Sequence, residues 1–106
     1  MYNKRAHTGS ALKLPIEQDA WMLFRFHNLE IIRLHLAPGT SIENHTNHWR
    51  IVFHVLRGEG TLDVEGTIHT LGEQQSIAVE AGKERFWKNP GKQNLELLVI
   101  KTEGEE

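Results

Sequence analysis

Histidine is the residue type in this sequence that is most able to take part in chemistry, because a neutral imidazole can bind a transition metal or transfer a proton. Seven histidines occur among the 106 residues, and His45, His48 and His54 lie close together. His45 and His48 point to opposite faces of an extended strand, since three residues separate them. A metal held by His45 with His48 therefore needs a kinked strand, and His54 is the other candidate for a second ligand.

In two segments of the chain, every second residue is one that could line a binding site for a small molecule. Neighbouring residues of a strand point to opposite faces, so every second residue shares a face. The residues that share a face are His45, Asn47, Ile51, Phe53 and Val55 in the first segment, and Arg85, Trp87 and Asn89 in the second. His54 has the other parity, with Val52 and Leu56, and we predict that it packs away from this face.

The composition is that of one ordinary globular domain and argues against several classes of function. Hydrophobic residues make up 39% and charged residues 25% of the chain, and the formal net charge is −2. The basic residues are scattered, whereas a nucleic-acid-binding surface needs them clustered. The absence of cysteine excludes disulfides and thiolate metal sites. There is no apolar run long enough to span a membrane and no signal-peptide core, so we expect a cytoplasmic protein.

Short apolar stretches separated by turn residues predict an all-β domain. Turn signals at Pro38-Gly39, Gly58-Glu59-Gly60 and Glu65-Gly66 fall between these stretches at the spacing of a sandwich or barrel. No stretch repeats apolar residues with helical periodicity. The predicted strands cover residues 21–26, 29–36, 51–56, 61–64, 67–71, 76–79, 85–88 and 95–101.

Two short motifs in this chain resemble those of the cupin family. Gly39, His45 and Gly58 match the first motif, and Gly82 and Asn89 match the second, all at the family's spacing. The resemblance covers roughly residues 30–100 and points to the small single-domain, RmlC-like members. It implies an antiparallel β-barrel, or double-stranded jelly roll, of six to eight strands with a site between two sheets.

The chain departs from the family at the positions that the resemblance implies for the metal ligands. These positions hold His45, Asn47, Ile51 and Arg85, which are one imidazole, one amide, one aliphatic side chain and one guanidinium. Arg85 has no lone pair to donate, and its positive charge repels a divalent cation. We therefore expect that the usual metal site is largely lost and that no cofactor is needed. A divalent transition metal is the second choice.

The replaced ligands leave a set of hydrogen-bond donors in an apolar cup. His45, Asn47, Arg85 and Trp87 are the predicted ligand-binding residues, and an anionic small molecule with a carboxylate or phosphate suits them. An Arg85 side chain that points into the barrel needs a partner, which Glu80, a backbone carbonyl or a bound anion would supply. The alternative is an Arg85 side chain that points out of the barrel mouth.

The remaining expectations concern domain limits and assembly. The barrel is predicted over residues 11–101, between a flexible arm at 1–10 and an acidic tail at 102–106. Members of the family are often dimers, and a homodimer is expected here. Its interface is expected on the outer face of one strand, where we place Trp49, Val52, His54 and Leu56.

Two other functions stay open at the level of the sequence. One is a metal-dependent cupin enzyme of the dioxygenase or isomerase type that uses non-standard histidine ligands. The other is a noncatalytic sensor or interaction module. The sequence names neither a substrate nor a reaction, and it assigns no catalytic residue.

Overall fold

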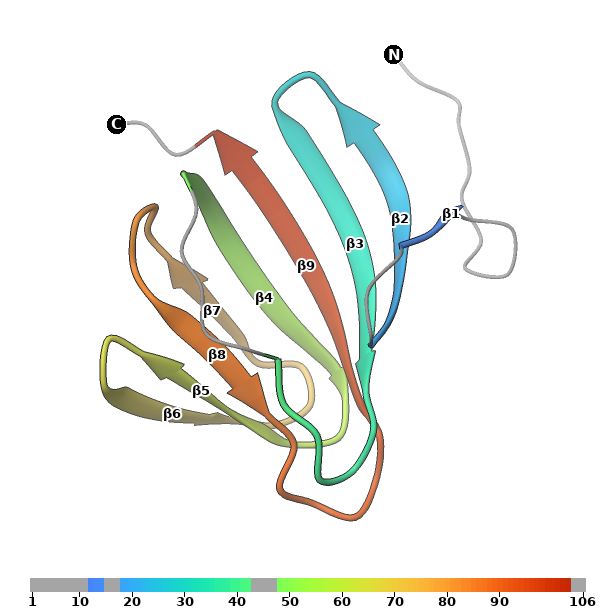
Figure 1. Ribbon diagram of the computed structural model, residues 1–106, viewed down its shortest axis with the longest axis vertical. Helices are drawn as coiled ribbons and strands as arrows, with labels where there is room; N and C mark the ends of the chain where they lie inside the picture. The colour runs from blue at the N-terminus through green and yellow to red at the C-terminus, as the bar shows by residue number, and fades with distance from the viewer. Residues whose placement is uncertain (1–11, 15–17, 43–47, 104–106) are drawn as a thin grey trace.

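The protein is described by a computed structural model that covers residues 12–14, 18–42 and 48–103 (Figure 1). These residues form nine strands and no helix, which confirms the predicted all-β fold class. The strands are β1 (Leu12–Lys13), β2 (Asp19–Phe26), β3 (Leu29–Leu36), β4 (Trp49–Arg57), β5 (Gly60–Val64), β6 (Thr67–Leu71), β7 (Ser76–Val79), β8 (Arg85–Lys88) and β9 (Leu95–Glu103).

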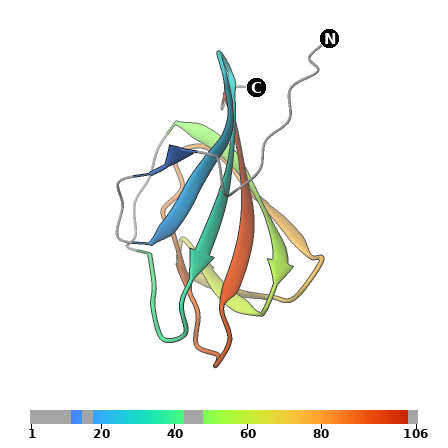
Figure 2. The same cartoon turned by 90° about the vertical axis from the view of Figure 1, so that its right-hand side faces the viewer.

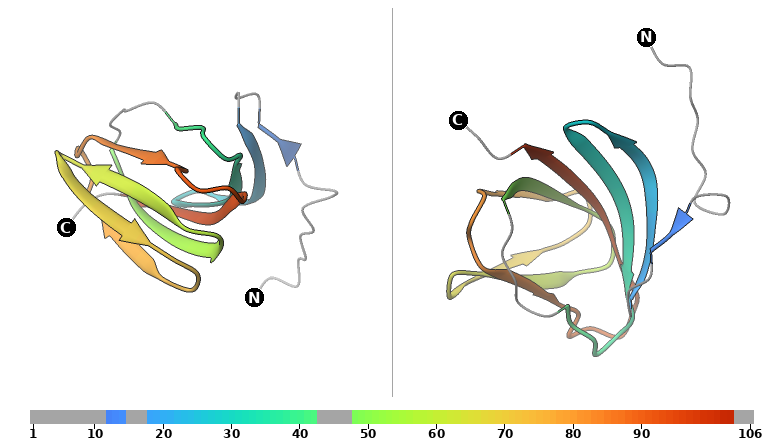
Figure 3. Two further views of the ribbon diagram at one scale, coloured as in Figure 1. Left: turned by 90° about the horizontal axis from the view of Figure 1, so that it is seen from below. Right: turned by 45° about the horizontal axis from the view of Figure 1, so that its top comes forward.

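The strands form two antiparallel sheets that face each other across the core (Figure 3). The larger sheet has the order β1-β2-β3-β9-β4-β7, and the smaller sheet has the order β6-β5-β8. The described residues form one strand more than the six to eight that were expected, and the additional strand is β1. This strand has two residues, of which Lys13 pairs with Trp21. A segment so short shows no alternation of its own, so the sequence does not reveal it.

In the described ranges no helix is both long and apolar enough to cross a membrane.

Alternation along each strand places the core between the two sheets. On β4 the side chains of Ile51, Phe53 and Val55 are buried and face inward, while those of Val52 and His54 lie on the outer face, as predicted. The buried side chains of β3, β9 and the smaller sheet that meet them are Ile32, Leu34, Leu36, Leu95, Leu97, Val99, Leu62, Leu71 and Trp87. Each large apolar side chain buried here contributes about 1.5–3 kcal/mol to folding.

Two features of the larger sheet differ from the expectations. Trp49 packs against the core rather than on the outer face, because it shares the parity of Ile51 on β4. β9 continues to Glu103, because Thr102 pairs with both Leu29 of β3 and Arg50 of β4. Thr102 and Glu103 are therefore strand residues rather than part of a tail. The expected arm at 1–10 and the last three residues lie outside the described residues.

Candidate ligand-binding site

β8 directs Arg85 and Trp87 into the barrel. This strand pairs with β5, where Val64 lies opposite Arg85 and Leu62 lies opposite Trp87. Both inward side chains are almost fully enclosed, since Arg85 and Trp87 are each 2% exposed. The Trp87 ring meets the Phe53 ring of the larger sheet edge to face, with 5.5 Å between centroids. Arg85 therefore sits on an aromatic and aliphatic wall and does not point out of the barrel mouth.

The Arg85 guanidinium is held by a backbone carbonyl rather than by a carboxylate. Its Nη1 donates to the carbonyl oxygen of Lys83 at 2.9 Å. Glu80, the carboxylate considered from the sequence, instead accepts from Arg50 at 3.0 Å. The ion pairs found among the described residues include none to Arg85. Burial lowers the pKa of Arg85 from its usual value, because desolvation disfavours the charged form.

Two nitrogen donors on this wall have no hydrogen-bond partner among the residues that the structure describes. They are Nη2 of Arg85 and Nε1 of Trp87. A buried donor left unpaired costs about 1–3 kcal/mol, and more when the group is charged. Natural proteins rarely keep such groups without a reason, so these two donors mark the part of the described interior that is best suited to receive a hydrogen-bond acceptor.

Asn89, which matches the second family motif, has a structural role instead. Its side chain is 1% exposed and donates to the carbonyl oxygens of Leu36 and Gln93, both at 2.8 Å. Its own side-chain oxygen accepts from the backbone N–H of Gly91 at 3.1 Å. Asn89 thus ties the end of β3 to the loop between β8 and β9. Its polar atoms are occupied by the backbone, so it offers little to a ligand.

The structure separates the other residues predicted for the site. His45 and Asn47 lie outside the described residues. His48 is exposed and stacks on Trp49, with 5.6 Å between ring centroids. His54 lies on the outer face of β4, where its Nδ1 is 2.6 Å from Ser76 Oγ. It therefore faces away from Arg85 and does not join a site inside the barrel.

The described members of the family's ligand set do not fit a transition metal. Ile51 is buried but has no ligating atom, and Arg85, which is also buried, carries a positive charge and has no lone pair to donate. In the part of the chain that the structure describes, no three histidine or acidic side chains are grouped so as to hold a metal ion.

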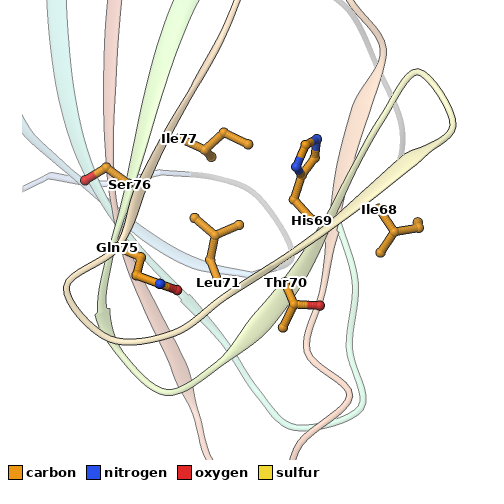
Figure 4. A pocket seen from close by; sticks show the side chains of 7 residues that line it. All are labelled: Ile68, His69, Thr70, Leu71, Gln75, Ser76 and Ile77. Carbon is orange, nitrogen blue, oxygen red and sulfur yellow. The ribbon is translucent and has the colours of Figure 1, made fainter.

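A separate depression lies between the edge strands β6 and β7 (Figure 4). It has a volume of about 580 Å³ and is lined by Ile68, His69, Thr70, Leu71, Gln75, Ser76 and Ile77. This lining holds no arginine or lysine, so it lacks the fixed positive charge that Arg85 gives to the interior.

The matching family model identifies the class of protein to which this fold belongs. A model described as Cupin domain matches residues 32–101. This match includes most of the described barrel, and the chain belongs to the cupin family.

The curated relatives that match this chain are two mannose-1-phosphate guanylyltransferases. A mannose-1-phosphate guanylyltransferase of Escherichia coli is 28% identical over 74 residues, which is 69% of this chain but 16% of that protein. The chain thus spans about a sixth of the length of the curated relatives it matches.

Solved structures extend the likeness over nearly the whole chain. An RmlC-like cupin from Shewanella frigidimarina has a TM-score of 0.85 at 19% identity and covers 99% of this chain and 95% of its own. A predicted oxalate decarboxylase from Thermotoga maritima has a TM-score of 0.85 at 17% identity and covers 93% and 98%. At these identities the likeness shows the fold alone.

Proposed function

We propose that this cupin binds an anionic small molecule, a carboxylate or a phosphate, inside the barrel against Arg85. The observation that supports this function is the pair of buried, unpartnered donors on β8, Arg85 Nη2 and Trp87 Nε1. An anion that accepts from both donors removes two desolvation costs at once and neutralises a buried positive charge.

The chemistry of the wall favours an anion over a neutral ligand. A hydrogen bond between a guanidinium and a carboxylate or phosphate is charge-assisted and about twice as strong as a neutral one. The rings of Trp87 and Phe53 give the ligand an apolar surface beside its charged group. His45 and Asn47 are proposed to complete the donor set, because they occupy two of the family's ligand positions.

The same residues support a binding role without the family's metal. Ile51 and Arg85 occupy two of the positions that hold metal ligands in the family. A bound anion is attracted by the Arg85 guanidinium, whereas a divalent metal ion beside it is repelled. Oxalate and mannose 1-phosphate, which the names of similar proteins mention, are both anions and serve as first probes.

Isothermal titration calorimetry with a panel of carboxylates and phosphates tests the proposal. The panel includes oxalate, mannose 1-phosphate and inorganic phosphate, with mannose as a neutral control. For a ligand that binds the wild type, Arg85→Ala is expected to weaken binding by about 1.5–3 kcal/mol, or roughly 10–150-fold. Trp87→Phe keeps an aromatic ring but removes the indole N–H, and a smaller loss is expected.

Lys83→Ala is the matched control, since it removes an exposed positive charge two residues away and leaves the backbone carbonyl that holds Arg85. Its affinity should equal that of the wild type. If the panel contains no ligand that distinguishes wild type from Arg85→Ala, or if Lys83→Ala has the same effect, the proposed site inside the barrel is wrong.

A further inference from the structure

A third depression lies outside the barrel, at one end of the larger sheet. It has a volume of about 440 Å³, which is in the range of sites for small molecules. Asp19 at the start of β2 pairs with His35 near the end of β3, and both face outward because their neighbours Ala20 and Leu34 are buried. Figure 2 shows the loop after β3 and the loop before β9, which also contribute to the depression, side by side at the lower end of the molecule.

The lining of this depression is polar and combines hydrogen-bond donors with acceptors. Six of the residues that line it have polar side chains, namely Gln18, Asp19, His35, Thr40, Ser41 and Asn94. The depression between β6 and β7, in contrast, is lined by the aliphatic side chains of Ile68, Leu71 and Ile77. A lining of mixed donors and acceptors suits a ligand with several hydroxyl groups, because each hydroxyl both donates and accepts.

His35 supplies a donor whose position is fixed. Its Nε2 accepts from Arg33 Nε at 3.3 Å, and because an arginine only donates, the proton of the neutral ring lies on Nδ1. Glu96 Oε1 is 3.7 Å from the same Nε2, too far for a hydrogen bond, and accepts from Arg33 Nη2 at 2.6 Å instead. Trp21 packs edge to face on the ring, with 4.9 Å between centroids. Among the described residues, the Nδ1–H of His35 has no hydrogen-bond partner.

The charges at this depression balance. The Asp19 carboxylate lies 3.2 Å from Lys13 Nζ, and both side chains are more than half exposed. An exposed ion pair is weak, so the carboxylate remains able to accept a hydrogen bond from a ligand. A neutral lining favours a neutral ligand, whereas the buried guanidinium of Arg85 inside the barrel favours an anion.

Hydrogen bonds hold the loop side of the lining in place before a ligand binds. The backbone N–H of Gly39 donates to the carbonyl oxygen of Asn89 at 2.8 Å, and the N–H of Asn89 donates to that of Thr40 at 2.9 Å. Gln18 Nε2 donates to the carbonyl oxygen of Ser41 at 3.1 Å and so joins β2 to this loop. A lining that is already ordered loses little conformational entropy on binding.

We infer that this depression binds a neutral polyhydroxylated molecule, such as a sugar or a cyclic polyol, at a site separate from the barrel interior. Asp19 accepts from a ligand hydroxyl, and His35 Nδ1 and the side-chain amide of Asn94 donate to ligand oxygens. Because the lining offers little apolar area to bury, the affinity is expected to be roughly millimolar.

Two-dimensional NMR of the full-length protein with mannose, glucose, galactose and myo-inositol tests the inference. At least one of these probes is expected to shift the backbone amide signals of Thr40, Ser41 and Asn94 and to saturate the shift. Ala37→Phe places a ring in the depression without removing a hydrogen-bonding side chain, and it should abolish the shift. Circular dichroism checks that the variant folds, and Ala37→Leu replaces it if it does not.

Two histidine variants test the assigned donor. His35→Phe keeps a ring against Trp21 but removes the Nδ1–H, and it should weaken binding roughly 3–10-fold. His54→Phe is the matched control, because His54 also lies on the outer face of the larger sheet but contacts Ser76. It should bind as the wild type does. Arg85→Ala should also leave this binding unchanged, which separates it from the binding of an anion inside the barrel.

Three results would overturn the inference. The first is that all four probes leave these amide signals unshifted at roughly 50 mM. The second is a shift that Arg85→Ala removes, since the neutral molecule would then lie inside the barrel. The third is a folded His35→Phe, or a folded variant at Ala37, that binds the probe as tightly as the wild type does.

Discussion

Arg85 and Trp87 share the inner face of β8 and are both proposed to donate to the ligand, but only Trp87 is also a packing residue of the core. Trp87 fills the core against Phe53, whereas Arg85 brings a charge into an apolar space and bonds to the backbone carbonyl of Lys83. A residue kept for ligand binding adds little to the stability of the ligand-free protein, and a packing residue adds much. Stability measurements therefore separate the two roles.

Arg85→Met and Trp87→Ala are expected to differ in their effect on the free energy of unfolding of the ligand-free protein. Arg85→Met keeps the apolar stem and removes a charge that is costly to desolvate, so the free energy of unfolding should be unchanged or higher. Trp87→Ala should lower it by about 3–5 kcal/mol, because it leaves a large cavity. Urea denaturation measures both. A loss with Arg85→Met as large as that with Trp87→Ala would make Arg85 a structural residue.

At the scale of elements, the turn before β5 depends on one glycine. Gly58 has a φ of 90°, which side chains other than hydrogen disfavour, and a Cβ placed there would lie 2.5 Å from the backbone oxygen of Asn94. Gly66 also has a φ of 90°, but a Cβ at this position meets no atom within 4 Å. The two turns therefore share the conformational strain and differ in the steric clash.

Gly58→Ala and Gly66→Ala are expected to destabilise the protein to different extents. Gly66→Ala should cost about 1–2 kcal/mol for the left-handed backbone alone. Gly58→Ala should cost more than this, because the loop that contains Asn94 must also move. Thermal and urea denaturation of the two variants measure the difference. Equal losses would mean that the loop yields freely and that the contact with Asn94 is unimportant.

For the whole molecule, the prediction concerns metal content. Protein purified without added metal should contain well under one equivalent of any transition metal, because two of the family's four ligand positions hold Ile51 and Arg85. Arg85→His combined with Asn47→His and Ile51→Glu should raise metal affinity by orders of magnitude. Elemental analysis after dialysis measures both. Stoichiometric metal in the wild type that is lost in His45→Ala would show that the chain kept a metal site.

Much of the fold follows from the sequence because alternation and turn chemistry are local. The segment Leu29–Leu36 reads as a strand from its own residues, and the structure has a strand with the same limits. The same holds for Arg85–Lys88, whose alternation also places Arg85 and Trp87 on one face. Gly39 and Gly82 have the positive φ values that a tight turn requires, as the matched motifs suggest.

The tertiary structure alone decided which partner each of these side chains meets. Strand alternation has a period of two and gives the face of a residue, but hydrogen bonds and contacts depend on the register of strands far apart in the sequence. Arg85 therefore bonds to the Lys83 carbonyl while Glu80 bonds to Arg50, and Asn89 reaches Leu36, 53 residues away. Ile31, Ile100 and Val52 likewise become neighbours only because β9 lies between β3 and β4.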